Sequence, residues 1–142
     1  FSMFFLERRL FMELNEIRNR FQAGRFATEC LKAVIEEAEP GYCRCSCSIL
    51  PEHCNAVGSV MGGAIFTLAD FAFAVASNTE QPVTVSLTSQ ITYLGTAKGK
   101  RLIAEARSRK TGRSTCYYEI LVTDELGNQV AAVTSSGFIK RP

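Results

Sequence analysis

Residues 55–78, NAVGSVMGGAIFTLADFAFAVASN, decide the fold of this chain. After Gly62-Gly63, the run over residues 64–78 carries Asp70 as its only charge. The pattern predicts a helix over Gly62–Asn78 that is apolar on every side, and such a helix must be buried on every side. A carboxylate is costly to bury there, so we expect Asp70 either to pair with another group or to take part in chemistry.

The start of this helix is a candidate ligand site. Gly62 and Gly63 have no side chains to keep a ligand away, and the first N–H groups of a helix are free to stabilise developing negative charge. Structural alternatives exist for each residue: tight packing at the glycines, an Asx turn at Asn55, and pairing of Asp70 across a dimer without catalysis. The sequence alone leaves these alternatives open.

Hydrophobic periodicity predicts the other elements. Helices are expected over residues 4–22 and 25–30, and strands over 32–39, 42–50, 83–94, 100–109, 114–123 and 129–139. Short connections between the later strands favour a mainly antiparallel sheet. Along 83–94, alternation predicts one face with Val83, Val85, Leu87, Ile91 and Tyr93.

These elements predict an α+β fold in which a curved antiparallel sheet wraps a long central helix. Residues 25–142 would form this domain, and residues 1–24 a helical extension before it. Since one sheet cannot cover every side of the helix, the remaining surface around Asp70 is expected to meet a second copy of the chain.

Composition narrows the partners. The 142 residues, 46% of them hydrophobic, suffice for one domain with a core, and the net charge of +2 indicates no particular partner. Between residues 98 and 113, seven lysines and arginines accompany Glu105 alone, which suits phosphate binding or a solvated hairpin. The stretch is short and lacks interleaved aromatic residues, so nucleic acid is not expected.

Signals for targeting and metal binding are also lacking in the sequence. The apolar run over 64–76 is too short to span a bilayer, and the first residues show no signal-peptide pattern, so a cytoplasmic protein without a membrane partner is expected. His53 is the only histidine and the six cysteines include no Cys-x-x-Cys pair, so no metal site is expected. Cys43, Cys45 and Cys47 alternate and should share one packed strand face.

The motif at the helix start resembles that of hotdog-fold acyl-CoA thioesterases of the phenylacetic-acid-degradation (PaaI-like) type. The family pattern is Asn-x-x-Gly-x-x-His-Gly-Gly with Asp seven residues later, and here it reads Asn55, Gly58, Met61, Gly62, Gly63 and Asp70. The likeness extends over residues 25–140 and implies a helix wrapped by an antiparallel sheet, in homodimers and often homotetramers. Met61 departs from the family histidine that lies beside the thioester carbonyl, and methionine cannot donate a hydrogen bond.

The resemblance implies roles for these residues. Gly63 N–H is the candidate oxyanion donor, Asp70 the general base or nucleophile, and Asn55 the group that positions water or the carbonyl. Because Gly63 and Asp70 are roughly 10 Å apart along one helix, the site should combine Gly63 and Asn55 of one chain with Asp70 of another. The predicted substrate contacts are Met61, Gly62 and Ser86, with Arg109, Lys110 and Arg113 on the phosphates of coenzyme A.

The expected function is therefore hydrolysis of an aryl- or medium-chain acyl-CoA, with no cofactor beyond the coenzyme A of the substrate. Met61 favours one alternative, an acyl-CoA-binding hotdog protein with little or no hydrolysis. A hotdog dehydratase is disfavoured because it needs an Asp/His pair, and His53 is not placed to supply one.

Overall fold

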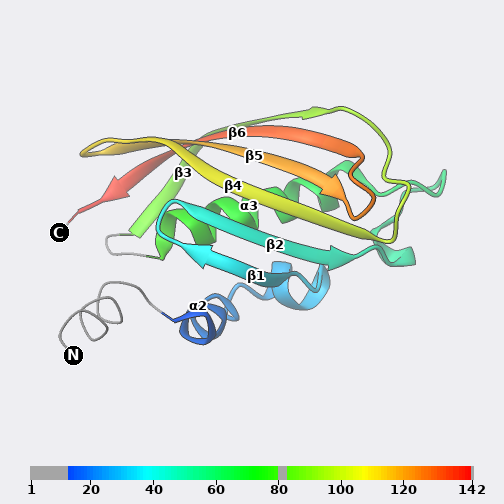
Figure 1. Ribbon diagram of the computed structural model, residues 1–142, viewed down its shortest axis with the longest axis horizontal. Coiled ribbons are helices and arrows are strands. Elements are labelled where there is room, and N and C mark those ends of the chain that lie inside the picture. The colour runs from blue at the N-terminus through cyan, green and yellow to red at the C-terminus, as the bar shows by residue number, and fades with distance from the viewer. Residues whose placement is uncertain (1–12, 80–82, 142) are drawn as a thin grey trace.

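The computed structural model describes residues 13–79 and 83–141 and shows one long helix against a six-stranded sheet (Figure 1). The strand order is β1-β2-β4-β5-β6-β3, and every neighbouring pair is antiparallel. The elements are α2 (Leu14–Phe21), a helical turn at Phe26–Cys30, β1 (Val34–Glu39), β2 (Tyr42–Ser48), a 3-10 turn at Pro51–His53, α3 (Gly62–Asn78), β3 (Val83–Tyr93), β4 (Arg101–Thr111), β5 (Thr115–Asp124) and β6 (Gln129–Lys140).

The predicted elements are confirmed in type and order. α3 has the predicted bounds, and the strands differ from the predicted ones by no more than a few residues at their ends. Of the helix expected over 4–22, the described part is α2, and residues 4–12 lie outside the described residues. No helix in the described ranges is long and apolar enough to cross a membrane. The boundary between residues 24 and 25 stays a prediction.

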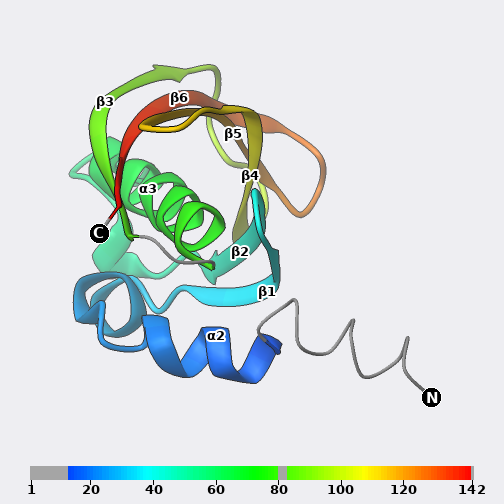
Figure 2. The ribbon, with the colours of Figure 1, turned by 90° about the vertical axis from the view of Figure 1, so that its left-hand side faces the viewer.

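The core lies between α3 and the concave face of the sheet, which curls around the helix (Figure 2). Leu68 and Ala72 of α3 are completely buried, as are Cys43 and Cys45 of β2. The thiol of Cys45 donates a hydrogen bond to the Leu68 carbonyl at 3.6 Å. The predicted shared face of Cys43, Cys45 and Cys47 is confirmed, and all six cysteines are free thiols.

The predicted facing of β3 is wrong in its first half. The pairing of β3 with β6 shifts between Ser86 and Thr88, which marks a bulge. Before the bulge, Thr84 is buried toward α3 whereas Val83 and Val85 are exposed; after it, Ile91 lies opposite the buried Val133. One extra residue reverses the facing, so the apolar residues on the two sides of the bulge do not share a face.

The two edges of the sheet differ. Along β1, the neighbouring helix α2 covers the edge, and Arg18 donates from Nε to the Ile35 carbonyl at 2.8 Å, beside the bulge of β1. β3 forms the other edge, and most of its residues are exposed. Open edges of this length are a template for pairing with another strand.

Asp124 fixes the loops at one end of the sheet. It is 2% exposed, and its carboxylate accepts hydrogen bonds from the backbone N–H groups of Lys98, Gly99, Leu126 and Asn128 at 2.8 to 3.0 Å. Burial raises the pKa of this carboxyl, but the hydrogen bonds outweigh burial and hold the pKa well below its usual range.

We expect Asp124→Asn to lower the melting temperature at pH 7 by roughly 5 °C or more, because an amide cannot accept from all these donors. Folding lowers the pKa of the Asp124 carboxyl, so its ionised form stabilises the folded protein. This stabilisation is present above the unfolded pKa of about 3.9 and is lost as the pH falls toward the folded pKa. In thermal melts at pH 7, 4 and 2.5, the difference in melting temperature between the wild type and Asp124→Asn should therefore become smaller as the pH falls. Equal melting temperatures at pH 7 would contradict this role.

Candidate active site

The start of α3 is crowded by two side chains that leave its N–H groups free. Met61 O accepts hydrogen bonds from Ala64 N at 3.0 Å and Ile65 N at 3.3 Å, whereas Gly62 N and Gly63 N have no acceptor among the described residues. A Cβ on Gly62 would lie 2.6 Å from the Tyr93 hydroxyl, and a Cβ on Gly63 would lie 3.1 Å from Met61 Cε. A side chain at Gly62 would therefore have to displace the Tyr93 hydroxyl, and unpaired donors are available at the helix start.

Asn55 forms the Asx turn that was the structural alternative for it. Its Oδ1 accepts from the N–H groups of Val57 and Ser59, both at 3.1 Å, in a loop that turns at Gly58 with φ +83°. Its Nδ2 has no acceptor within the described ranges. Since Met61 N donates to His53 O at 2.9 Å, this loop is attached at the helix start. The Asx turn therefore uses only the Oδ1 of Asn55 and leaves its Nδ2 as a donor in a fixed loop.

Asp70 lies two turns further along α3. Its side chain is half-buried, and no hydrogen bond or ion pair of its carboxylate occurs in the part of the chain that the structure describes. Burial raises the pKa of this carboxyl. Arg25 borders the same shallow groove but pairs with Glu29 at 2.9 Å.

The face of α3 that carries Asp70 is the one that the sheet leaves uncovered. The incompletely buried residues recur at helical spacing along it, namely Gly63, Phe66, Thr67, Asp70 and Ala74. Because Asp70 lies on the same stripe as Gly63, both are accessible from one side of the molecule.

His53 does not replace the missing family histidine. It is 6% exposed; its Nδ1 accepts from Leu50 N at 3.2 Å, and its Nε2 lies 3.3 Å from the Cys30 carbonyl oxygen. These partners fix the tautomer with the proton on Nε2 and leave neither nitrogen for a ligand. Nor do three or more Cys, His, Asp or Glu residues gather to hold a metal ion anywhere in the described ranges.

The basic residues lie at the other end of α3 from Gly63. The hairpin between β4 and β5 is connected to the C-terminal part of α3, because Ser108 N donates to Gly41 O and Gly41 N donates to Ala76 O (Figure 1). Arg109 pairs with Glu119 at 2.8 Å. Within one chain, Arg109, Lys110 and Arg113 are therefore not brought together with Gly63.

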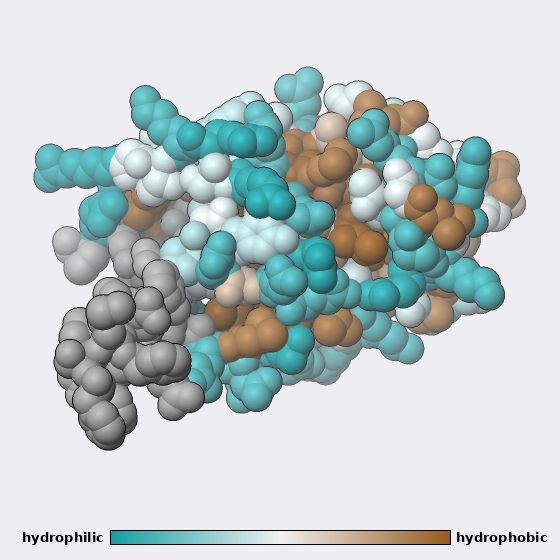
Figure 3. Space-filling view, viewed as in Figure 1, coloured by the Kyte–Doolittle hydropathy of each residue, from teal (hydrophilic) through white to brown (hydrophobic). Residues whose placement is uncertain are grey.

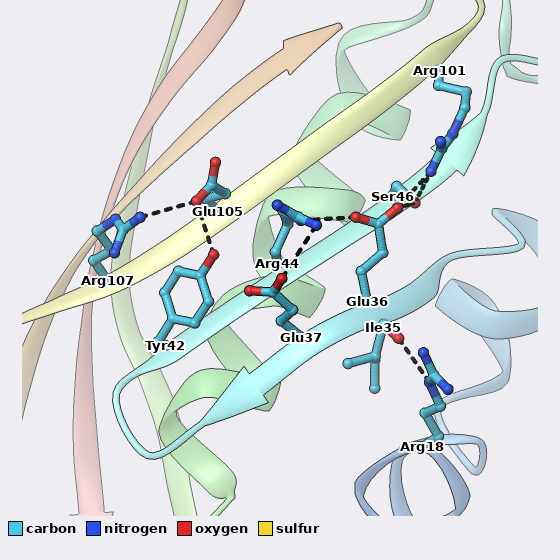
Figure 4. A network of polar contacts seen from close by, with 10 residues as sticks. All are labelled: Arg18, Ile35, Glu36, Glu37, Tyr42, Arg44, Ser46, Arg101, Glu105 and Arg107. Carbon is cyan, nitrogen blue, oxygen red and sulfur yellow. Dashed lines mark hydrogen bonds and ion pairs between the residues drawn. The ribbon is translucent and has the colours of Figure 1, made fainter. Parts of the chain in front are cut away.

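Two other cations of the basic stretch, Arg101 and Arg107, are paired on the outer face of the sheet, where hydrophobic residues lie among hydrophilic ones (Figure 3). Glu36 accepts from both Arg44 and Arg101, at 2.8 and 2.6 Å, and Arg107 lies 3.1 Å from Glu105 (Figure 4). This network favours the solvated-surface interpretation for the part of the stretch that includes Arg101 and Arg107.

The two ends of β3 have different positions relative to the candidate site. Ser86 is opposite Gly137 in the half of β3 that begins beside the end of α3, where Thr84 N donates to Asn78 Oδ1 at 2.8 Å. Tyr93, at the other end of β3, contacts Gly62. Sequence reasoning placed Tyr93 on a strand face only; no local motif indicates a contact across 31 positions of sequence.

Comparisons with known proteins agree with this fold. The family model described as the thioesterase superfamily matches residues 57–131. The chain is 30% identical over 106 residues to the acyl-coenzyme A thioesterase PaaI of Escherichia coli, covering 72% of this chain and 76% of that protein. The TT0310 protein of Thermus thermophilus has a TM-score of 0.74 at 32% identity, with 80% of this chain and 96% of that one covered.

A structure of smu.793 from Streptococcus mutans bound to acetyl CoA has a TM-score of 0.72 at 28% identity, and the match covers 76% of this chain and 88% of that one. The chain therefore belongs to the thioesterase superfamily and is a thioester hydrolase of the hotdog fold. Within that class it is of the PaaI-like type.

The unpaired carboxylate of Asp70 has a consequence for stability. Burial raises the pKa of the Asp70 carboxyl in the folded protein. The carboxyl therefore ionises more readily in the unfolded chain, and the folded protein loses stability as the pH rises above the unfolded pKa of about 3.9. We expect Asp70→Asn to raise the melting temperature by a few degrees at pH 7 and to make no difference at pH 3, where both side chains are neutral. Asp124→Asn serves as a control of opposite sign at pH 7. A lower melting temperature for Asp70→Asn at pH 7 would mean that the carboxylate is paired in the assembled protein.

Proposed function

We infer that this protein hydrolyses the thioester of an aryl- or medium-chain acyl-CoA to the free acid and coenzyme A, in a site shared by two subunits. The observation that carries this proposal is Asp70, a half-buried carboxylate with no partner in the described residues, on the uncovered stripe of α3 that also holds Gly63. A charge of this kind is retained at a cost to stability, which is typical of functional sites.

The residues can divide the chemistry between them. Gly63 N–H and Asn55 Nδ2 are donors for the thioester carbonyl oxygen, where negative charge develops as the tetrahedral intermediate forms. Asp70 either removes a proton from the attacking water or attacks the carbonyl itself, and the coenzyme A thiolate leaves as the tetrahedral intermediate collapses. In the second case the acyl group is left on Asp70 as an anhydride, which water then hydrolyses to the free acid. The proposal requires no cofactor.

The geometry of the helix supports a shared site. Gly63 and Asp70 are separated by roughly 10 Å along α3, too far for both to touch one carbonyl. If two copies of α3 cross antiparallel near Phe66 and Thr67, each Gly63 faces Asp70 of the partner subunit. The open edge of β3 supports the same pairing, since a second β3 would continue the sheet. Homodimer and homotetramer both satisfy this arrangement.

Coenzyme A as the carrier is supported by the relative from Streptococcus mutans, whose structure holds acetyl CoA. Its phosphates would contact Arg109, Lys110 and Arg113, and the hairpin of the partner subunit is the one that could approach Gly63. Ser86 keeps its proposed role as an assisting hydroxyl only if it too acts across the subunit interface. A cytoplasmic location remains a prediction from the sequence.

The alternative function is acyl-CoA binding without hydrolysis. Met61 favours it, because a thioether donates no hydrogen bond and both nitrogens of His53 are occupied. Thiol release from a panel of acyl-CoAs, with Asp70→Asn as the control, separates the two: turnover that the variant loses supports the enzyme, and binding without turnover supports the alternative.

A complementation experiment tests the shared site. Asp70→Asn removes the carboxylate, and Asn55→Asp keeps the Oδ1 acceptor of the loop while replacing the Nδ2 donor. We expect each variant alone to lose at least about a hundredfold in kcat/KM with unchanged oligomer size. Co-expressed, about half of random dimers are mixed, and each has one intact site, so activity should recover to about a quarter of wild type.

The control for that experiment is the double variant, Asp70→Asn with Asn55→Asp in one chain, co-expressed with wild type. If sites are shared, its mixed dimers contain no intact site, and only dimers of two wild-type chains contribute. Full loss without recovery in the first mixture would show that each site belongs to a single chain.

Met61→His restores the family residue beside Gly63, where the Met61 methyl group already lies close to the backbone. We expect kcat on the best substrate to rise by roughly tenfold, because the imidazole adds a hydrogen-bond donor at the carbonyl. Met61→Gln is a size-matched control without a titratable group. Unchanged kcat in Met61→His would show that this position does not limit the rate.

A further inference from the structure

The side chains of Met61 and His53 supply no hydrogen-bond donor for a ligand at the start of α3. Both line a cavity of about 560 Å³ that opens beside Gly63. The thioether of Met61 has no proton to donate, and His53 uses the proton on Nε2 for the Cys30 carbonyl oxygen at 3.3 Å. The hydroxyl of Tyr93, which lies against Gly62, is a donor that comes from another part of the chain.

Tyr93 is the last residue of β3 and reaches the helix start because of the bulge in that strand. Counted in steps of two from the exposed Val85, Tyr93 would point to the outer face of the sheet. The bulge reverses the facing, so Tyr93 is opposite the buried Ala131 and lies on the concave side with α3. There, a Cβ on Gly62 would lie 2.6 Å from the hydroxyl oxygen and 2.8 Å from Cζ of Tyr93.

The hydroxyl of Tyr93 is unpaired and accessible. Among the described residues it has no hydrogen bond, not even to the N–H of Gly62, and the residue is 52% exposed. Since a carbon–carbon bond is about 1.5 Å long, the hydroxyl oxygen lies within about 4.1 Å of the Cα of Gly62. The next backbone nitrogen is Gly63 N. One oxygen atom can therefore accept from Gly63 N at about 2.9 Å and from the hydroxyl at about 2.7 Å.

We propose that the Tyr93 hydroxyl is a catalytic donor that binds the thioester carbonyl oxygen together with the N–H of Gly63 in the same chain. The inference rests on the proposed function and adds a catalytic residue to it. The hydroxyl keeps its proton throughout. Its hydrogen bond becomes stronger as the carbonyl oxygen gains negative charge in the tetrahedral intermediate, and weaker again as the thiolate leaves.

Tyr93→Phe tests this role, because it removes the hydroxyl and keeps the ring over Gly62. We expect kcat on the best acyl-CoA to fall by about a hundredfold with little change in KM, since the hydrogen bond matters mainly in the transition state. The melting temperature should stay that of the wild type, because the hydroxyl has no partner in the described residues. An unchanged kcat would overturn the proposal.

Tyr42→Phe is the matched control. It also removes a tyrosine hydroxyl, one that donates to Glu105 at 2.9 Å on the outer face of the sheet (Figure 4). This variant should keep the wild-type kcat. An equal loss of kcat in Tyr42→Phe and Tyr93→Phe would mean that the loss does not come from the helix start, and would contradict the assignment.

Infrared spectra of a bound analogue make the test independent of turnover. A ketone analogue of acyl-CoA, with a methylene group between the sulfur and the carbonyl, is not hydrolysed, and a hydrogen bond to its carbonyl oxygen lowers the carbonyl stretching frequency. With an isotopic label on the carbonyl carbon, we expect a higher frequency in Tyr93→Phe than in the wild type, and no change in Tyr42→Phe. The same frequency in Tyr93→Phe and the wild type would contradict the contact.

The two measurements separate this proposal from the proposed function. If the wild type hydrolyses no acyl-CoA, the proposed function fails, and the infrared comparison still decides whether Tyr93 binds the carbonyl. If the wild type hydrolyses acyl-CoA while Tyr93→Phe keeps both the kcat and the carbonyl frequency, the function stands and the role of Tyr93 fails.

Discussion

The burial of α3 against the concave face of the sheet is the constraint on which the rest of the structure depends. The helix has almost no polar side to turn toward water, so the sheet must curl around it, and the small thiols of β2 allow the two to approach closely. The sheet leaves one stripe of α3 uncovered, and the candidate reactive groups lie on that stripe. The candidate site therefore lies on the face of α3 that does not pack against the sheet.

Two carboxylates, Asp70 and Asp124, have opposite environments in this structure. Asp124 is almost fully buried and accepts backbone hydrogen bonds from both loops around it, which makes its ionised form the stable one. Asp70 is half-buried and has no such donors in the described residues, so its ionised form is a cost. The chain tolerates that cost on the face of α3 that the sheet leaves uncovered, as expected if Asp70 accepts a proton in the proposed reaction.

The start of α3 combines several independent features into one site. The loop of Asn55 is attached at the helix start through Met61, the glycines allow Tyr93 and Met61 to approach the backbone, and the cavity opens directly beside Gly63. Each feature alone has an ordinary structural explanation. Together they place unpaired N–H donors beside a mainly apolar cavity at the helix start.

The sequence by itself determined the fold class, the bounds of α3, the shared face of the β2 cysteines and the motif residues, because hydrophobic periodicity and glycine placement are local signals. It did not determine the reversed facing of β3, since a bulge depends on the pairing of two strands. The contact of Tyr93 with Gly62, the occupied nitrogens of His53 and the separation of the basic hairpin from Gly63 were likewise decided only by tertiary structure. All three bring together, or keep apart, residues that are distant in sequence, and no local pattern records such distances.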